Sequence, residues 1–496
     1  MRSGVVHIWQ LKGFFRQPPP HVQILLSLCL GLTLCAADST PPSPDKPWSP
    51  PGLERYSNEL TNKESPSSAA EPKLEASKIY DLPELIDIAE RSHPETRVAW
   101  ERARTAANAL GISQSAYYPY LAASAAAGYE HGPAPFLTDI ISGSAAQENV
   151  ALSLDWLLFD FGERQAAVAA AREKLMAANV TFNATHQQIV FAVTKAFYDF
   201  NTARQNVTVK ESSRAAAQTV NDAAQARFDN GLATKTDLLQ AQQQTAQAVY
   251  ELEAARGNLS DARVTLVESL GILPSTELQV AEVPEKDLNG DFDDSLDRLI
   301  DRALAQRPDL VAKLATVRAD RAQVKQARAD FYPKLAAGAS VGWEKLDVNA
   351  YGGPYVGNSK PTYTVGISLQ LPIFDGFLRA NKLRAAKSQL RAAESELTDS
   401  RDTVVRQVWK AYTDLKTARQ KQDAADKFLA AAQSAFDATL ESYRQGLGTY
   451  IAVANAQQNL DNARSTVVNT RAAIHTTSAA LALSVGDLAK PVPHQP

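Results

Sequence analysis

Apolar and polar residues alternate strictly along two neighbouring stretches of the chain. Residues 335–344 hold one apolar set, at Leu335, Ala337, Ala339, Val341 and Trp343. Residues 363–371 hold another, at Tyr363, Val365, Ile367, Leu369 and Leu371. A period of two residues is typical of β-strands with one apolar face. Residues 345–361 between them are rich in glycine, proline and asparagine, so we predict a loop there and a β-hairpin over residues 334–372.

The same pattern occurs a second time, earlier in the chain. Matching segments are Tyr118-Pro119 with Tyr332-Pro333, Phe159-Asp160 with Phe374-Asp375, and Gly271 with Gly486. The spacing is 214 residues for the first match (332 minus 118) and 215 for the other two (374 minus 159, 486 minus 271). So constant a spacing indicates an internal duplication. We therefore predict two similar repeats, the first with a β-hairpin over residues 120–158.

The predicted strands keep charged residues off their apolar faces. Glu130, Asp155 and Glu344 all fall on the polar faces. This segregation is typical of a transmembrane β-barrel, so we expect these three side chains to face its lumen and the apolar side chains to face lipid. Four strands cannot close a barrel, so further copies of the chain would have to complete it. The alternative is a soluble helical protein with two surface hairpins.

The remainder of each repeat has a helical pattern. Residues 81–117 and 295–331 are interrupted by the repeat mates Pro94 and Pro308, which end helices. No glycine or proline lies between Gly162 and Gly231, which allows a helix of roughly 100 Å. The stretch from residue 376 to residue 446 repeats this feature.

Apolar residues recur every seven positions along these helices, which indicates supercoiling. They are Leu175, Phe182, Ile189 and Ala196, and in the second repeat Leu383, Leu390, Leu397, Val404, Ala411, Ala418, Ala425 and Ala432. The returning helices carry Leu238, Leu252, Leu259, Leu266 and Leu273, matched by Val453, Leu460, Val467, Ile474 and Leu481. We predict long antiparallel helical hairpins over residues 163–271 and 377–486.

The repeats then extend over residues 80–271 and 294–486, joined by a linker at 272–293 and followed by a tail at 487–496. Residues 1–37 resemble an export signal with a cut before Asp38, because basic residues precede an apolar core that ends in small residues. The rival interpretation is a lipoprotein signal with lipidation at Cys35, although Leu34 is large for that motif. Residues 38–79 are rich in proline and serine and predict an extended arm.

The charged residues, histidines and short motifs of the sequence do not form a recognisable catalytic or metal-binding pattern. The net charge is −4 with no basic face, so nucleic acid is not an expected partner. The histidines are scattered without metal-ligand spacing, and no phosphate-binding loop or nucleophile elbow occurs. We therefore expect neither an enzyme nor a bound cofactor or metal.

Several motifs together resemble the TolC family of outer-membrane efflux proteins. They are His93-Pro94-Glu95, Ala116-Tyr117-Tyr118-Pro119, Leu158-Phe159-Asp160-Phe161-Gly162, Leu371-Pro372-Ile373-Phe374-Asp375-Gly376 and Ser442-Tyr443-Arg444-Gln445-Gly446. The resemblance implies a mainly α fold with a β membrane part. It further implies a homotrimer with a twelve-stranded outer-membrane β-barrel and a periplasmic α-helical barrel, in the outer membrane of a Gram-negative bacterium. The implied partners are a periplasmic adaptor and an inner-membrane transporter, proton-driven or ABC.

The resemblance also implies roles for residues at the hairpin turns. The adaptor would dock at Gly231, Leu232, Thr234, Gly446, Leu447 and Thr449. The periplasmic entrance would be gated near Asp237, Arg444, Tyr450 and Asn455. Family members often place two aspartates at the positions of Ala452 and Asn455, so an acidic ring is not expected at this entrance.

The expected function is that of an exit duct for small toxic compounds in a tripartite efflux system. An alternative with the same fold is the exit duct of a type I protein secretion system. A different class, a structural coiled-coil protein of the cell envelope, explains the heptads but not the paired amphipathic strands. The adaptor of such a pump is disfavoured because it normally has a single helical hairpin.

Overall fold

A computed structural model of the chain describes residue 58 and residues 74–75, 77–136, 139–283, 295–350 and 353–488. The export signal, Cys35, most of the arm and linker, and nearly all of the tail lie outside the described residues. The chain divides into two units, Met1–Glu71 and Pro72–Pro496, and only the second unit is described below. Among the described residues, no helix is long and apolar enough to cross a membrane.

The two repeats have the same order of elements. The first contains α3 (Leu82–Ser92), α4 (Pro94–Ser115), β2 (Tyr120–Phe136), β3 (Asp139–Phe159), α5 (Glu163–Asp229) and α6 (Lys235–Ser269). The second contains α7 (Leu296–Gln306), α8 (Pro308–Ala329), β5 (Lys334–Ala350), β6 (Val356–Gln370), α9 (Leu378–Arg444) and α10 (Tyr450–Val485). Two short strands, β1 (Ile79–Tyr80) and β4 (Gln279–Val280), pair in parallel. The helix breaks at Pro94 and Pro308 are as predicted, since each proline opens a helix.

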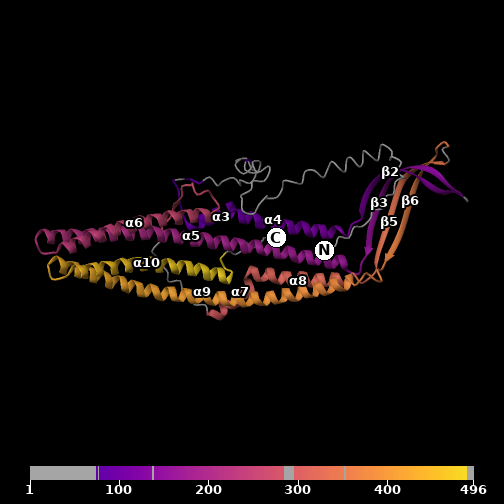
Figure 1. Cartoon of the computed structure of the whole chain (residues 1–496). Coiled ribbons are helices and arrows are strands. Elements are labelled where there is room, and N and C mark those ends of the chain that lie inside the picture. Colours follow the sequence, from indigo (N-terminus) through magenta and orange to yellow (C-terminus); the bar gives the residue numbers. More distant parts are fainter. Residues whose placement is uncertain are drawn as a thin grey trace, which may run out of the picture. The chain divides into compact units, whose positions relative to one another are not determined.

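The long helices α5 and α9 organise the helical part. Each has 67 residues, as the absence of glycine and proline predicted. Helices α8 and α10 both pack against α5 and α9 and lie end to end between them (Figure 1). Helices α4 and α6 pack against α5, on the outer side of this arrangement.

Most of the predicted heptad positions form the core between these helices. In α9, Val404, Ala411, Ala418, Ala425 and Ala432 are buried, and in α10 all five predicted positions are buried. Leu273 is an exception, since its side chain is 55% exposed and it lies beyond the end of α6 at Ser269. The prediction for Leu273 was wrong because the turn at Leu270-Gly271 stops the heptad register before it.

The four long strands form one antiparallel sheet in the order β2-β3-β5-β6. Its register brings the predicted apolar faces together, because paired residues point to the same side of a sheet. One row across the sheet is Leu121, Leu154, Ala339 and Val365, and the next is Ala123, Leu152, Val341 and Tyr363. The outer strands β2 and β6 each leave one edge unpaired within the described residues.

The strands are longer than the sequence predicted. Strand β5 runs to Ala350 and β6 begins at Val356, so most of the predicted loop at 345–361 is paired strand. The prediction gave too much weight to glycine and proline. Pro361 lies in the edge strand β6, where a residue without an N–H is tolerated.

Each hairpin joins its long helix through a sharp backbone reversal. The reversal consists of two consecutive residues with positive φ, Phe161 (51°) and Gly162 (91°) in the first repeat, Gly376 (63°) and Phe377 (66°) in the second. Residues other than glycine rarely adopt this backbone conformation, so each repeat has one phenylalanine with a strained backbone. The strain is offset by an aspartate and an arginine that flank the reversal in both repeats and are described below.

Candidate functional site

The turns of the two helical hairpins have the same local geometry. Gly231 (φ 71°) and Gly446 (φ 84°) adopt the left-handed conformation that ends a helix. The N–H of Leu232 donates to Arg227 O (2.8 Å), and that of Leu447 donates to Ser442 O (2.9 Å). The leucine side chains are left outside, with 68% of Leu232 and 82% of Leu447 exposed. Two large apolar side chains therefore project from the turns.

The helices that leave the turns are capped differently. Thr234 and Asp237 form a capping box, in which the carboxylate accepts from Thr234 N (3.2 Å) and the threonine hydroxyl (2.9 Å). Thr449 accepts only a long bond from Ala452 N (3.4 Å), because alanine stands where the first repeat has Asp237. Asp237, predicted near the gate, thus has a capping role within its own chain.

Arg227 links the two turns and was missed from the sequence. Its guanidinium donates to Tyr443 O of the second hairpin and to Leu232 O of its own (3.1 Å), and it lies 4.6 Å from the centroid of the Tyr443 ring. The repeat mate of Arg227 is Ser442, so the duplication gave no signal. A basic residue in the last turn of a helix is also expected from the helix dipole alone.

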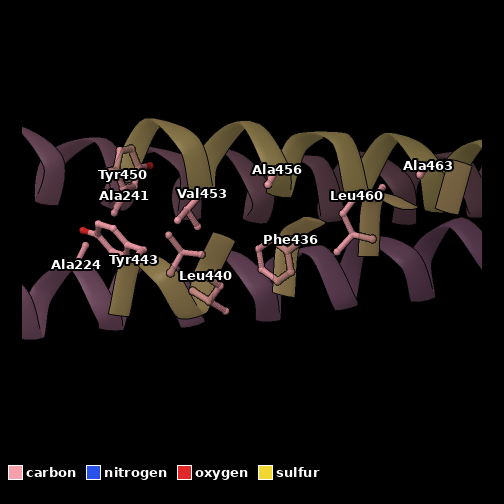
Figure 2. Close-up of a cluster of buried hydrophobic side chains, with 12 residues drawn as sticks. Ala224, Ala241, Phe436, Leu440, Tyr443, Tyr450, Val453, Ala456, Leu460 and Ala463 are labelled. Carbon is pink, nitrogen blue, oxygen red and sulfur yellow. The ribbon is translucent and has the colours of Figure 1, made fainter. Parts of the chain in front are cut away.

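The predicted gate residues occupy different environments. Arg444 and Asn455 are exposed. Tyr450 is 6% exposed and packs edge-on against Tyr443, at a centroid distance of 6.4 Å, in the core shown in Figure 2. Burial raises the pKa of both tyrosines. Since Tyr450 is enclosed by Val453 and other residues of its own chain, we retain Arg444 and Asn455 but not Tyr450 as gate candidates.

A polar seam joins the two hairpins where α5 faces α10. Ser213 donates to Asp461 (2.6 Å), and burial raises the pKa of that carboxyl. Further along, Tyr198 stacks on His475 at 4.5 Å, and burial lowers the pKa of the histidine. The hairpins are therefore held together by a few specific contacts in addition to apolar packing.

The register places the three predicted lumen residues on one face of the sheet. Asp155 pairs with Gly338, and Glu344 pairs with Asn149 on one side and Lys360 on the other. Glu344 also accepts a hydrogen bond from Gln147 (3.1 Å). Glu130 shares this parity and is exposed. Lys360 was missed because it lies in the segment predicted as a loop.

The apolar face has a sharp boundary. On β5 it extends from Leu335 to Trp343, which fits the roughly 9–11 residues that a transmembrane strand needs. The next residue of the same parity is Lys345, which forms ion pairs with Glu148 (3.4 Å) and Asp347 (3.1 Å). The opposite boundary is aromatic, with Phe159, Phe161 and Tyr332 in contact. An apolar band between aromatic and charged rows is the pattern of a lipid-facing surface.

The part of the chain that the structure describes contains no group of three histidine, cysteine or acidic side chains able to hold a metal ion.

The family model for outer membrane efflux proteins matches residues 85–272 and 299–487. The chain belongs to this family. The two matched segments correspond to the two repeats. The chain is an outer-membrane channel of the efflux type with a large periplasmic helical part, and the predicted family, mainly α fold with a β part, channel function and location are confirmed.

Curated relatives match over most of their length. The protein CyaE of Bordetella pertussis is 29% identical over 77% of this chain and 80% of its own. The outer membrane efflux protein BepC of Brucella suis is 28% identical over 71% and 73%. The outer membrane protein TolC of Escherichia coli is 22% identical over 78% of each chain.

Solved structures have the same fold. The outer-membrane channel OprN superimposes with a TM-score of 0.72 over 84% of this chain and 94% of its own, at 18% identity. The outer membrane protein VceC of Vibrio cholerae superimposes with a TM-score of 0.71 over 82% and 96%, at 21% identity.

Proposed function

We propose that three copies of the chain form one continuous duct across the outer membrane and the periplasm. The observation that carries this proposal is the register of the sheet. It aligns apolar residues on one face and Glu130, Asp155, Glu344 and Lys360 on the other, and leaves β2 and β6 as open edges. Open edges are not tolerated in lipid, and three four-stranded sheets would supply twelve strands.

The duct is passive, because its proposed parts are a lumen and two turns and none of them requires a catalytic step. Glu130, Asp155 and Glu344 outnumber Lys334 and Lys360, the lysines on the same face, so the lumen of the sheet carries net negative charge and favours cations over anions. A periplasmic adaptor docks at the turns, where Leu232 and Leu447 offer exposed apolar side chains beside Gly231, Thr234, Gly446 and Thr449. An inner-membrane transporter supplies the energy.

The proposed cargo is small toxic compounds. The proposal is supported by a relative named for efflux, BepC, and by one named for pyoverdine export, OpmQ of Pseudomonas aeruginosa, which is 26% identical over 88% of this chain. The second candidate is protein export, which the relative named alkaline protease secretion protein AprF favours, at 28% identity over 63% of this chain.

Deletion of the chain, complementation and a cross-linked pull-down from native envelopes test the proposal. We expect a trimer in detergent, bound to an adaptor and a proton-driven transporter, and a deletion strain with increased sensitivity to small antibiotics. Co-purification with an ABC transporter, together with loss of a secreted protein and unchanged antibiotic sensitivity, would favour the second candidate. A monomer without envelope partners would contradict the duct itself.

The gate is tested by charge reversal at Arg444. If tip contacts of Arg444 close the entrance, Arg444→Glu admits large antibiotics that the unaltered channel excludes. Unchanged uptake would remove Arg444 from the proposed gate. Asn455→Asp is a second variant at a predicted gate residue, because it adds a negative charge and keeps a side chain of the same size.

A further inference from the structure

A groove of about 720 Å³ crosses the helical layer just below the sheet. Its lining comes from α4, α5, α8 and α9, which pack side by side in that order (Figure 1). These helices contribute the parts near the sheet, and Lys382, for example, lies just after the start of α9 at Leu378. Because the two outer helices of the layer, α4 and α9, both line the groove, it lies on the concave side of the layer.

The burial of α8 agrees with this orientation. Gln323 and Gln326, which line the groove, are half-buried although they are polar. Arg318 and Lys325 lie on the other side of the helix, where they are exposed and line a separate pocket together with residues of α5. The two sides of the layer therefore differ, and the groove is on the more enclosed side.

The heptad register connects the groove with the predicted periplasmic entrance, because residues seven apart share a face of a supercoiled helix. Lys410 is four heptads after Lys382 (410 minus 382 is 28), and it lines a second pocket further along α9. Leu483 of α10 also lines that pocket and is four heptads after the gate candidate Asn455 (483 minus 455 is 28). The groove thus shares its face with the entrance, which makes this face the lumen of the proposed duct.

Three cations line the groove, namely Arg102 of α4, Lys174 of α5 and Lys382 of α9, and all three are exposed. Within the described residues, none of them forms an ion pair or a side-chain hydrogen bond, although other lysines of α5 and α9 pair with an aspartate one turn away. The one acid among the lining residues is Asp330, and it faces Lys334 at 3.5 Å. The groove therefore carries a surplus of positive charge.

The duplication does not account for these cations. Their repeat mates are Thr316 (102 plus 214), Gln389 (174 plus 215) and Ala167 (382 minus 215), and none of these carries a charge. Like charges gathered on one surface repel each other and disfavour the compact state. A bound anion would offset that repulsion, so the surplus of charge points to a ligand.

We propose that this groove binds the anionic groups, carboxylate or phosphate, of compounds that the duct exports. The inference rests on the proposed duct and specifies a class of its cargo. Arg102 offers a planar guanidinium that can hold two oxygens at once, whereas Lys174 and Lys382 act as point charges. The side-chain amides of Gln323 and Gln326 add N–H donors, and the volume of the groove is within the range of ligand sites, about 300–1,000 Å³.

The groove and the lumen of the sheet have opposite charge. Along the proposed path, an exported compound passes the cations of the groove before it reaches Asp155 and Glu344 in the sheet. The cations attract an anionic group, and the acids beyond them weaken its hold, so that binding stays reversible as conduction requires. A compound that carries both charges meets a complementary region in each part. The cargo therefore includes anionic and zwitterionic compounds.

Calorimetric titration of the purified trimer in detergent with inorganic tripolyphosphate tests the site independently of the gate. We expect saturable binding that weakens as the salt concentration rises, because exposed charges are screened. The groove variant, with Arg102→Gln, Lys174→Gln and Lys382→Gln, should bind roughly tenfold or more weakly. All three side chains are exposed, so the variant should still give the heat-resistant trimer.

A matched control removes the same number of charges from the opposite face of the layer. It carries Arg172→Gln, Arg318→Gln and Lys325→Gln, at exposed residues that line other pockets. This variant should bind tripolyphosphate within about twofold of the unaltered trimer. A trimer that binds no tripolyphosphate, or that loses binding equally in both variants, would overturn the groove and leave the duct. A monomer would overturn both.

Two further measurements connect the site with cargo. Tricarballylate, which has carboxylates in place of phosphates, should compete with tripolyphosphate, and failure to compete would overturn the shared site for both groups. In a deletion strain, the groove variant should restore resistance to the cationic dye ethidium but leave sensitivity to the anionic antibiotic fusidic acid roughly fourfold higher than the unaltered chain does. Equal restoration of both resistances would overturn the role in export. A deletion that changes neither sensitivity would contradict the proposed efflux, while the titration still decides the groove.

Discussion

The two repeats share element order and helix length but not the way in which their ends are held. At the junction with the sheet, Asp160 accepts from Arg164 Nε (2.9 Å), and Arg164 also donates to the carbonyls of Ala116, Leu157 and Leu158. In the second repeat, Arg379 donates to Asp375 (2.6 Å) and stacks on Phe331.

The turns differ in the same way, with more side-chain bonds in the first repeat than in the second. The first has a capping box and Arg227, which reaches across to Tyr443, whereas the second has a single long cap bond. The first repeat therefore has more side-chain bonds of its own at the junction and at the turn. The second turn is held in part by Arg227 of α5.

The largest expected effect concerns the lipid-facing side of both repeats. Leu154 and Leu369 are repeat mates on the apolar face (369 minus 154 is 215), although Leu369 lies in the edge strand. We expect Leu154→Arg and Leu369→Arg each to cost ~2–4 kcal/mol per chain if the apolar face meets lipid at mid-bilayer. The measurement is the yield and heat resistance of the folded oligomer in outer membranes.

The neighbouring polar positions provide matched controls. Ser153→Arg and Ser368→Arg place the same charge on the other face and should fold normally. Tolerance of Leu369→Arg but not of Leu154→Arg would mean that β6 does not face lipid, and would break the equivalence of the two repeats.

Strand alternation and the duplication predicted which residues share the apolar face, and the register confirms this grouping, because successive side chains of a strand point to opposite faces. The positions of the breaks at Pro94 and Pro308 were predicted for a similar reason, since proline acts locally. The ends of the strands were not predicted correctly. Gly357 and Pro361 suggested a loop, but both residues pair with the neighbouring strand. Leu273 shows the same limit, as a turn cancels its heptad position.

The contacts between the two helical hairpins were the least predictable. Arg227 and Asp461 bond to Tyr443 and Ser213, which lie far away in the sequence, and neither has a repeat mate of the same type. The two turns could be predicted from Gly231 and Gly446, because the left-handed backbone conformation there favours glycine. The sequence could not identify which side chain crosses between the two turns.

The next expected effect compares the two junctions. Arg164→Ala leaves Asp160, which is 5% exposed, without its guanidinium and removes the bonds to three carbonyls. We expect a loss of roughly 3 kcal/mol in the stability of the first repeat. Arg379→Ala should cost clearly less, because Asp375 is better solvated. Thermal unfolding followed by circular dichroism gives both values, and equal losses would contradict the comparison.

The effect at the turns should be smaller. Arg227→Ala removes the contacts to Tyr443 O and Leu232 O, and we expect cleavage at the second turn by an added protease to accelerate by about tenfold. Arg214→Ala is the control, because this arginine lies on the same helix as Arg227 but is exposed and distant from the turn. Similar protease sensitivity of the two variants would show that the second turn is held without Arg227.

The smallest expected effect is the difference in stability that the N-terminal caps of α6 and α10 provide. Thr234→Ala removes a capping box and should cost about 1 kcal/mol, whereas Thr449→Ala removes one bond of 3.4 Å and should cost less than half of that. The reciprocal variant Ala452→Asp gives the second turn the residue that the first has and should stabilise it. Hydrogen exchange at the first turns of α6 and α10 resolves these differences, because each cap protects amides of its own helix. If Ala452→Asp leaves exchange at α10 unchanged, then the weaker second turn is set by packing around Tyr450 and not by the missing cap.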